Sequence, residues 1–353
     1  MIPRFYYHPR MTEYDFGPRH PLKPERLRRT IALLEVVEPG IELLDPGLAL
    51  DTDVLRIHSP DYLETIQALS NGMCVEDMRG FGPGDNPPFH GMYEASLGYL
   101  GGTVRAAEDV RDGAELAFNI AGGLHHARRD RVSGFCIFND PAVACAILRE
   151  RFERVLYIDI DLHHGDGVQW LFYDDPSVIT LSIHQDGRTL YPGTGFVDET
   201  GADLSSINIP LPPRTTGGVW LHAFSSILPL VVERHRPEAI VLQMGSDPHR
   251  LDPLGHLECL AQHWVEAVRL VRDLGLPIVA VGGGGYNLTT VPRMWVAAIL
   301  TLSGIEVPTA IPEQISSDWR MTAFFDDEAQ VPYGNEEVEH IITHWQSHLS
   351  ARI

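Results

Sequence analysis

The stretch RVLYIDIDLHHGDG, residues 154–167, decides how this 353-residue chain is interpreted. An apolar run carries Asp159, Asp161 and His163 at alternate positions and ends in a glycine turn. Alternate side chains of an extended strand share a face, so these three groups are expected to point the same way where the strand stops. A buried carboxylate is costly unless it is paired or bound to a cation. The stretch therefore predicts a site that binds metal or handles protons; the alternative is a polar strand end exposed to water.

The composition is typical of a soluble, acidic, globular protein. It has 44% hydrophobic residues, and 27 basic against 48 acidic residues give a formal net charge of −21. That charge opposes non-specific binding to nucleic acid and favours cationic ligands, although it also serves solubility alone. No apolar leader or membrane-spanning stretch is expected, which favours a cytoplasmic enzyme without a membrane partner. The four cysteines form no CxxC pair and are expected to be reduced and structural.

Short β-branched runs alternate with helical stretches from residue 115 onward. This alternation predicts an α/β fold: a single-domain, doubly wound, mainly parallel sheet flanked by helices, spanning residues 1–353. The expected strands cover 117–121, 155–160, 178–184, 239–244 and 277–283. The expected helices cover about 24–37, a segment beginning at Ser59, 92–111, 139–151, 216–234, 256–274, 289–303 and about 335–350, whereas 1–23 are expected to be irregular.

Unusual polar groups follow four of the expected strands. His125 and His126 follow the first, the Asp-x-Asp-x-His stretch follows the second, and Asp247 and Tyr286 follow the last two. Ligands of open α/β sheets bind outside the carboxyl ends of the strands. The sequence therefore predicts one site at one edge of the sheet.

Two carboxylates and one imidazole of this set predict a metal centre. Asp161, His163 and Asp247 leave a position free for water, as in an open catalytic zinc site. A dinuclear site would need another carboxylate two residues after the histidine, where this chain has Gly165, so a single ion is favoured. Zn²⁺ and Fe²⁺ both suit these ligands. His249 is a further ligand candidate, with an ordinary loop residue as the alternative.

The tandem histidines are candidates for acid–base chemistry. Asp159 and Asp166 are available to orient His125 and His126 through hydrogen bonds from Nδ1–H. His126 is the expected base and later acid, and the metal and the Tyr286 hydroxyl are expected to stabilise an oxyanion.

Six motifs in this order resemble the histone deacetylase family, in particular its bacterial acetoin-utilisation branch, which is similar to the class I enzymes. They are GGLHHA, SGFCIFND, DIDLHHGDGVQ, SIHQ…YPGTG, GSD…DPLG and GGGGYN, and the resemblance runs from about residue 20 to about residue 300. It implies an arginase/deacetylase-like fold and zinc-dependent hydrolysis of an Nε-acetyl-lysine amide, which releases acetate. It also implies that the metal, histidine, aspartate and tyrosine groups named above have the roles given there.

The resemblance assigns further residues to the substrate and to a structural K⁺. Tyr191 stands where many members of the family have Phe, which adds a hydroxyl group to the tunnel wall. The glycines before Tyr286 permit a tight turn near the substrate. The assigned residues are Asp85 at the rim, the Gly134 carbonyl, the walls Phe135, Tyr191 and Leu254, Gly284 in the glycine turn, Arg26 near an inner acetate channel, and Ser182 with Asp159 for K⁺.

Two other functions stay open from the sequence. An acetylpolyamine amidohydrolase would use the same site on a small cation, and a non-catalytic acyl-lysine-binding module would use the fold without the chemistry. For the deacetylase, the expected partner is an acetylated protein, with acetyl-CoA synthetase suggested by the family branch.

Overall fold

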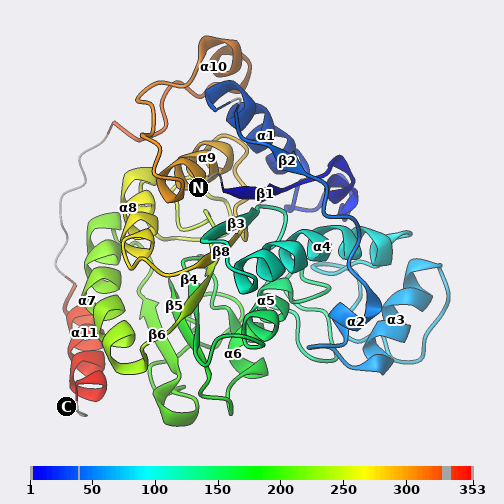
Figure 1. The fold of residues 1–353 in the computed structure, drawn as a ribbon, viewed down its shortest axis with the longest axis horizontal. Coiled ribbons are helices and arrows are strands. Elements are labelled where there is room, and N and C mark those ends of the chain that lie inside the picture. Colours follow the sequence, from blue (N-terminus) through cyan, green and yellow to red (C-terminus); the bar gives the residue numbers. More distant parts are fainter. Residues whose placement is uncertain (1–2, 39, 328–334, 351–353) are drawn as a thin grey trace.

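Eight parallel strands form one sheet at the centre of the molecule (Figure 1). The computed structural model describes residues 3–38, 40–327 and 335–350. The strand order is β2-β1-β3-β8-β7-β4-β5-β6. The strands are β1 (Arg4–Tyr6), β2 (Leu43–Leu44), β3 (Leu116–Asn119), β4 (Val155–Asp159), β5 (Val178–Gln185), β6 (Ser206–Leu211), β7 (Ala239–Gln243) and β8 (Ile278–Val281).

Helices cover both faces of the sheet, so the predicted doubly wound parallel fold is confirmed. One face carries α4 (Met92–Arg111), α5 (Asp140–Leu148) and α6 (Asp166–Leu171). The other carries a row of helices in the order α1 (Glu25–Val37), α9 (Thr290–Leu302), α8 (Ala261–Arg272), α7 (Gly217–His235) and α11 (Glu336–Leu349). Shorter helices are α2 (Asp51–Val54), α3 (Pro60–Ser70), α10 (Glu313–Trp319) and the 3-10 turns η1 (Pro9–Glu13) and η2 (Ala202–Leu204).

No helix in the described part of the chain is both long enough and apolar enough to cross a membrane.

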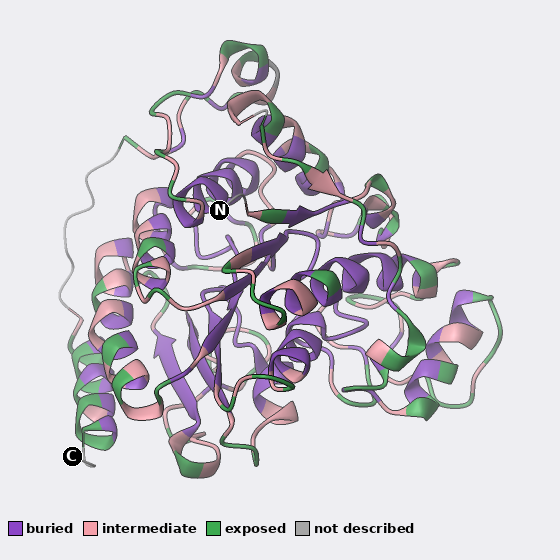
Figure 2. Cartoon of the chain, in the orientation of Figure 1, coloured by how far each residue is buried: buried purple, intermediate pink, exposed green. Residues whose placement is uncertain are grey.

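The central strands are apolar because helices bury them on both sides. Every residue of β4, β5, β7 and β8 is buried, and Figure 2 shows this buried layer between helices with exposed outer faces. Helix α3 begins as predicted, with the Ser59 hydroxyl accepting a hydrogen bond from the N–H of Tyr62 and Pro60 in the first turn.

The structure corrects several expected elements. Residues 1–23 are not wholly irregular, because they contain β1 and η1. Strand β6 was missed because Asn208 and Pro210 interrupt its apolar pattern; a proline is tolerated there because β6 is an edge strand. Helix α8 begins at Ala261, after the expected start at 256, because the preceding residues bridge to Thr216 and His249.

The four strands followed by the polar groups are neighbours. Strands β3, β8, β7 and β4 are consecutive in the sheet and parallel, so their carboxyl ends lie at one edge. The loops after them therefore meet beyond the middle of that edge, where ligands of open α/β sheets bind.

Candidate active site

Side-chain atoms of Asp161, His163 and Asp247 meet beyond the ends of β4 and β7. His163 Nδ1 lies 3.1 Å from Asp247 Oδ2 and 3.3 Å from Asp161 Oδ1. Strand β4 ends at Asp159, so Asp161 and His163 lie in the following loop, and the prediction that one strand face aligns all three groups was wrong. The loop itself orients them, since the N–H of His163 donates to Asp161 and that of Leu162 donates to Asp247.

This donor set fits a divalent metal ion. Two ligand atoms bound tetrahedrally at about 2.1 Å lie about 3.4 Å apart, close to the separations found here. The Asp161 and Asp247 side chains are each 1% exposed or less, and buried carboxylates need a nearby cation. The three side chains together match the ligand types and burial of a catalytic zinc or ferrous site.

Each tandem histidine is hydrogen-bonded to its own carboxylate. His125 Nδ1 lies 2.7 Å from Asp159 Oδ2, and His126 Nδ1 lies 2.6 Å from Asp166 Oδ1. Asp159 and Asp166 are the two carboxylates that the sequence suggested for this role, and the structure shows which histidine each one holds. An Nδ1–H held by a carboxylate leaves Nε2 free to accept a proton. Arg128 also donates to Asp166, at 2.7 Å. The two Nε2 atoms lie 3.1 Å apart, so the histidines face a common point.

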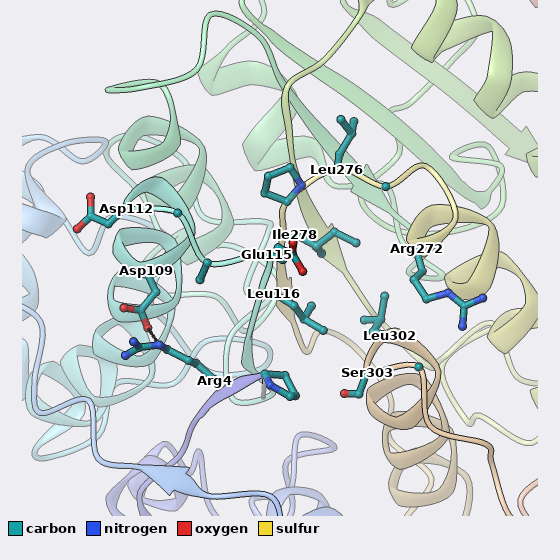
Figure 3. Close-up of a pocket in the computed structure, with 16 residues that line it drawn as sticks. Arg4, Asp109, Asp112, Glu115, Leu116, Arg272, Leu276, Ile278, Leu302 and Ser303 are labelled. Atoms are coloured by element: carbon teal, nitrogen blue, oxygen red, sulfur yellow. Dashed lines mark ion pairs between the residues drawn. The ribbon is translucent and has the colours of Figure 1, made fainter. Parts of the chain in front are cut away.

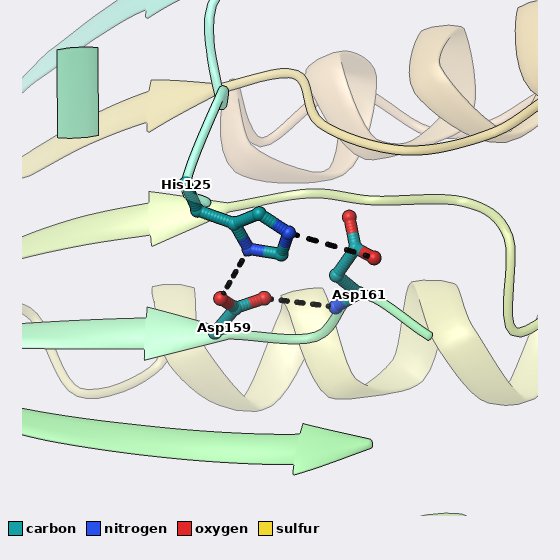
Figure 4. Close-up of side chains that lie close together, drawn as sticks. All are labelled: His125, Asp159 and Asp161. Atoms are coloured by element: carbon teal, nitrogen blue, oxygen red, sulfur yellow. Dashed lines mark hydrogen bonds and ion pairs between the residues drawn. The ribbon is translucent and has the colours of Figure 1, made fainter. Parts of the chain in front are cut away.

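His125, Asp159 and Asp161 form a second cluster of metal-ligating types (Figure 4). The His125 ring lies between the two carboxylates, and its contact with Asp159 is a hydrogen bond of 2.7 Å. That separation is shorter than the roughly 3.4 Å between two ligands of one ion. The geometry is therefore that of an orienting pair beside a single metal position.

The charges of the cluster depend on burial and on close carboxylates. Burial lowers the pKa of His125, but Asp159 and Asp161 outweigh this and raise it to about 9. Burial and the neighbouring His125 lower the pKa of His126 to about 4. Burial also opposes a proton on His163, but Asp161 and Asp247 raise its pKa to about 10. The raised pKa values of His125 and His163 thus both follow from the buried carboxylates around them, which make this position favourable for positive charge.

A cavity of about 20 Å³, enough for about one water molecule, lies between the histidines and the glycine turn. Burial raises the pKa of Tyr286, and Asp247 and Asp161 add to the shift, so its hydroxyl stays protonated. The cavity is lined by Leu22, Gly123, Leu124, His125, His126, Gly134, Phe135, Cys136, Asp161, Gly283, Gly284 and Tyr286.

Two aromatic rings stand beside this cavity. The Tyr191 ring packs edge-on against His126, with centroids 5.0 Å apart, and the Phe135 ring packs edge-on against Tyr286, with centroids 5.9 Å apart. Gly134 lies between them with φ of +50°, and a Cβ there would come within 2.3 Å of His126 Cδ2. Glycine is required at this position because both the backbone conformation and the space exclude a side chain.

Phe135 adopts a left-handed backbone conformation, with φ of +68°. This is unusual for a bulky residue and is kept only when the surroundings determine it. Its N–H donates to Asn86 Oδ1 at 2.9 Å, and its carbonyl accepts from the Tyr14 hydroxyl at 2.7 Å. The two loops that carry Tyr14 and Asn86 therefore set the position of the Phe135 wall.

The other expected substrate residues differ in how closely they approach the cluster. Arg26 is buried and donates to the carbonyls of Gly283 and Gly285, at 2.7 and 3.1 Å. Gly284 lines the cavity, and its N–H donates to Asp161 at 2.8 Å. Arg26 thus acts on the glycine turn itself.

Asp85, Leu254 and Ser182 lie further from the cavity lining. The Asp85 side chain is exposed, and its carbonyl lies 3.1 Å from His20 Nε2. Leu254 is half-buried. Ser182 pairs in register with Asp159 on the neighbouring strand, and its hydroxyl lies 2.9 Å from His184 Nδ1.

His249 is not part of the metal-binding group. It is buried and lies 3.1 Å from Asp326 and 3.1 Å from the guanidinium of Arg293. The interpretation of His249 as a loop residue is therefore correct. Its contacts attach the loop after Asp247 to the segment that contains Asp326.

The sequence interpretation missed two polar residues of the site. Gln243 Nε2 donates to Asp161 Oδ2 at 2.7 Å, and Asp252 accepts a hydrogen bond from the N–H of Tyr286 at 2.7 Å. Gln243 is a polar residue at the end of an apolar strand, which is the same signal that identified the Asp-x-Asp-x-His stretch. Asp252 belongs to the DPLG motif, but its partner lies 34 residues away.

A larger hollow of about 940 Å³ lies at the opposite edge of the sheet, at the amino ends of β3 and β8 (Figure 3). Its charged side chains are dispersed: Arg4 pairs with Asp109, and Arg272 donates to Asp273. Among the described residues, it contains no group of three metal-ligating side chains within bonding reach of one ion. Size alone therefore does not identify the chemical site.

The fold and this site define the class of protein. Residues 20–302 match the histone deacetylase domain, and the chain belongs to the histone deacetylase family of hydrolases. The resemblance seen in the sequence motifs is confirmed.

Known relatives cover most of the chain. It is 39% identical to the acetoin utilization protein AcuC of Bacillus subtilis over 333 residues, which is 90% of this chain and 86% of AcuC. It is 34% identical to histone deacetylase 6 of Arabidopsis thaliana, over 87% of this chain and 68% of that protein. Among solved structures, a histone deacetylase homologue complexed with SAHA superposes with a TM-score of 0.91 at 30% identity, covering 98% of this chain and all of that chain. A homologue from Aquifex aeolicus gives a TM-score of 0.87 at 31% identity, covering 97% and 99%.

Proposed function

We propose that this protein hydrolyses the Nε-acetyl amide of lysine side chains in proteins and releases acetate. The observation that carries the proposal is that a metal-binding donor set, two carboxylate-paired histidines and a partly buried tyrosine surround one small cavity. The family and the similarity to AcuC support it.

Asp161, His163 and Asp247 are proposed to hold one metal ion, Zn²⁺ or Fe²⁺. When bound, such an ion polarises the acetyl carbonyl and acidifies a water molecule. In the described structure, Gln243 and the N–H of Gly284 both donate to Asp161 Oδ2, which orients that carboxylate. Such outer hydrogen bonds fix a ligand before the ion arrives.

His126 is proposed to accept the proton of the attacking water at Nε2. Its Nδ1–H is held by Asp166, and burial keeps the imidazole neutral. As negative charge develops on the carbonyl oxygen, the protonated Tyr286 hydroxyl donates a hydrogen bond to it. His126 then returns the proton to the leaving lysine amine, as general acid catalysis requires.

The walls of the site suit an unbranched chain. Phe135 and Tyr191 are proposed to flank the four methylenes of lysine, with Leu254 as a further wall. The Gly134 carbonyl, which now accepts a weak hydrogen bond from the Cys136 thiol, is proposed to accept the substrate N–H. The exposed Asp85 carboxylate is proposed to bind the substrate backbone at the rim.

A K⁺ ion is proposed beside the metal, near Asp159 and Ser182, which are paired in register on β4 and β5. An acetylated cytoplasmic protein is the proposed substrate, and the similarity to acetoin utilization proteins makes acetyl-CoA synthetase the first one to test. The net charge of −21 supports a cationic rather than a nucleic-acid partner.

The decisive test compares acetate release from an acetyl-lysine peptide and from an acetylated polyamine, with zinc supplied and then removed by a chelator. Faster peptide cleavage that stops on chelation would support the proposal. Faster polyamine cleavage, which the acidic charge also favours, would make the protein a small-molecule amidohydrolase. Peptide binding without cleavage of either substrate would indicate a binding module.

A further inference from the structure

The Asp252 carboxylate connects two loops of the candidate site. Its Oδ2 accepts the N–H of Tyr286 at 2.7 Å, and its Oδ1 accepts the N–H of Leu254 at 3.0 Å. The residue is 6% exposed, so both bonds are largely shielded from water. Burial raises the pKa of this carboxyl to about 6, whereas the N–H groups of Tyr286 and Leu254 act in the opposite direction and favour the carboxylate.

The backbone before Tyr286 needs external partners. It consists of four glycines, and Gly283 and Gly285 have φ of +143° and +131°. Glycine has no side chain to restrict the backbone, so such a turn is intrinsically mobile. Arg26 binds the carbonyls of Gly283 and Gly285, and Ser246 donates its N–H to the Gly284 carbonyl at 2.9 Å.

These bonds stop one residue short of the tyrosine. The N–H of Tyr286 is the backbone group nearest its side chain, and Asp252 is its hydrogen-bond partner. A buried charge-assisted hydrogen bond of this length is stronger than one between neutral groups. Asp252 therefore holds the backbone from which the Tyr286 side chain extends.

We propose that Asp252 is a positioning residue that places the Tyr286 hydroxyl for catalysis and, through Leu254, sets the tunnel wall. This inference rests on the proposed deacetylase function and goes beyond it, since Asp252 belongs neither to the metal-binding group nor to the cavity lining and acts through Tyr286. Displacing a catalytic group by about 1 Å can reduce turnover by about a hundredfold.

The test is a double-mutant cycle on the zinc-loaded protein with the acetyl-lysine peptide. Asp252→Asn keeps the shape but replaces one acceptor oxygen by an amide donor that cannot accept an N–H. We expect kcat to fall roughly tenfold to a hundredfold while zinc content stays stoichiometric. In the Tyr286→Phe background the same change should lower kcat by less than about threefold, because no hydroxyl remains to be positioned.

The controls separate positioning from a general loss of structure. Asp175 also accepts a backbone N–H, that of Ser177 at 3.0 Å, but lies before β5 at the amino edge of the sheet. Asp175→Asn should leave kcat unchanged. Asp252→Glu keeps both acceptor oxygens one methylene further out, and it provides the same cycle if the asparagine variant does not fold.

Each outcome decides the inference. Equal losses of kcat with and without the Tyr286 hydroxyl, or no loss at all, would overturn the role of Asp252 while the deacetylase function stands. A wild-type protein that cleaves no acetyl-lysine peptide would refute the proposed function, and the role of Asp252 with it.

Discussion

The hydroxyl groups of Ser133 and Tyr191 lie 2.5 Å apart, although 58 residues separate them in the chain. This hydrogen bond joins the loop that carries Gly134 and Phe135 to the ring that packs against His126. The two aromatic walls of the proposed tunnel are therefore connected. The structure gives the additional hydroxyl of Tyr191 a definite partner.

Removing this bond should weaken substrate binding more than chemistry. Tyr191→Phe and Ser133→Ala each remove one partner of the hydrogen bond. A typical hydrogen bond contributes about 1 kcal/mol, so we expect either substitution to raise KM about fivefold. We expect kcat for the acetyl-lysine peptide to stay within about twofold. The double variant should resemble either single variant, since both remove the same bond. Multiplicative effects on KM would show that the two hydroxyls act independently.

Tyr286→Phe should lower kcat by about a hundredfold, which is the usual effect of losing one oxyanion donor. The ring packing against Phe135 does not require the hydroxyl, so folding should be unaffected. Zinc content by atomic absorption and kcat by acetate release test this together. A variant with wild-type turnover would remove Tyr286 from the mechanism.

Asp247→Ala should abolish tight metal binding. It removes one of only two carboxylates in the donor set, and the affinity for zinc should fall by more than about a hundredfold, beyond the effect of losing an outer hydrogen bond. Zinc retained after dialysis is the measurement, with Asp175→Asn as the control. Stoichiometric zinc in the alanine variant would refute the proposed ligand set.

Acid should destabilise the fold in part through His58. Burial lowers its pKa to about 4, below the unfolded value near 6.5, so the unfolded chain binds more protons between these pH values. The contribution of neutral His58 to the free energy of unfolding is therefore fully present above about pH 6.5. It decreases as the pH falls, and at pH 5 the protein is less stable by about 2 kcal/mol from this residue alone.

His58→Gln tests this prediction. His58 Nε2 accepts a hydrogen bond from the N–H of Asn139, and its Nδ1–H donates one to the Arg128 carbonyl. A glutamine amide also has one acceptor and a donor, but it does not titrate. The free energy of unfolding is measured with urea at pH 7 and at pH 5. Its decrease between these pH values should be about 2 kcal/mol smaller in this variant than in the wild type. Exposed His90, changed to Gln, is the control. Equal pH dependence in all three proteins would exclude His58 as a source.

Much of the architecture could be predicted because its signals are local. The apolar runs at β4, β7 and β8 predicted buried parallel strands. The helix predicted over residues 92–111 has the same bounds as α4 (Met92–Arg111). The short strands β1, of three residues, and β2, of two residues at the edge of the sheet, bury too few side chains to leave a pattern, and they were missed.

The sequence by itself determined the chemical inventory: the paired carboxylates, the tandem histidines, the tyrosine after the glycines and the edge of the sheet where they gather. Only the tertiary structure decided which atoms meet. The order of β3, β8, β7 and β4 brings Asp247 to His163, and loop packing brings Asp252 to Tyr286 and Ser133 to Tyr191. The physical reason is the sequence separation over which interactions act. Periodicity and spacing report interactions within one strand or turn, whereas contacts between distant residues depend on how whole elements pack.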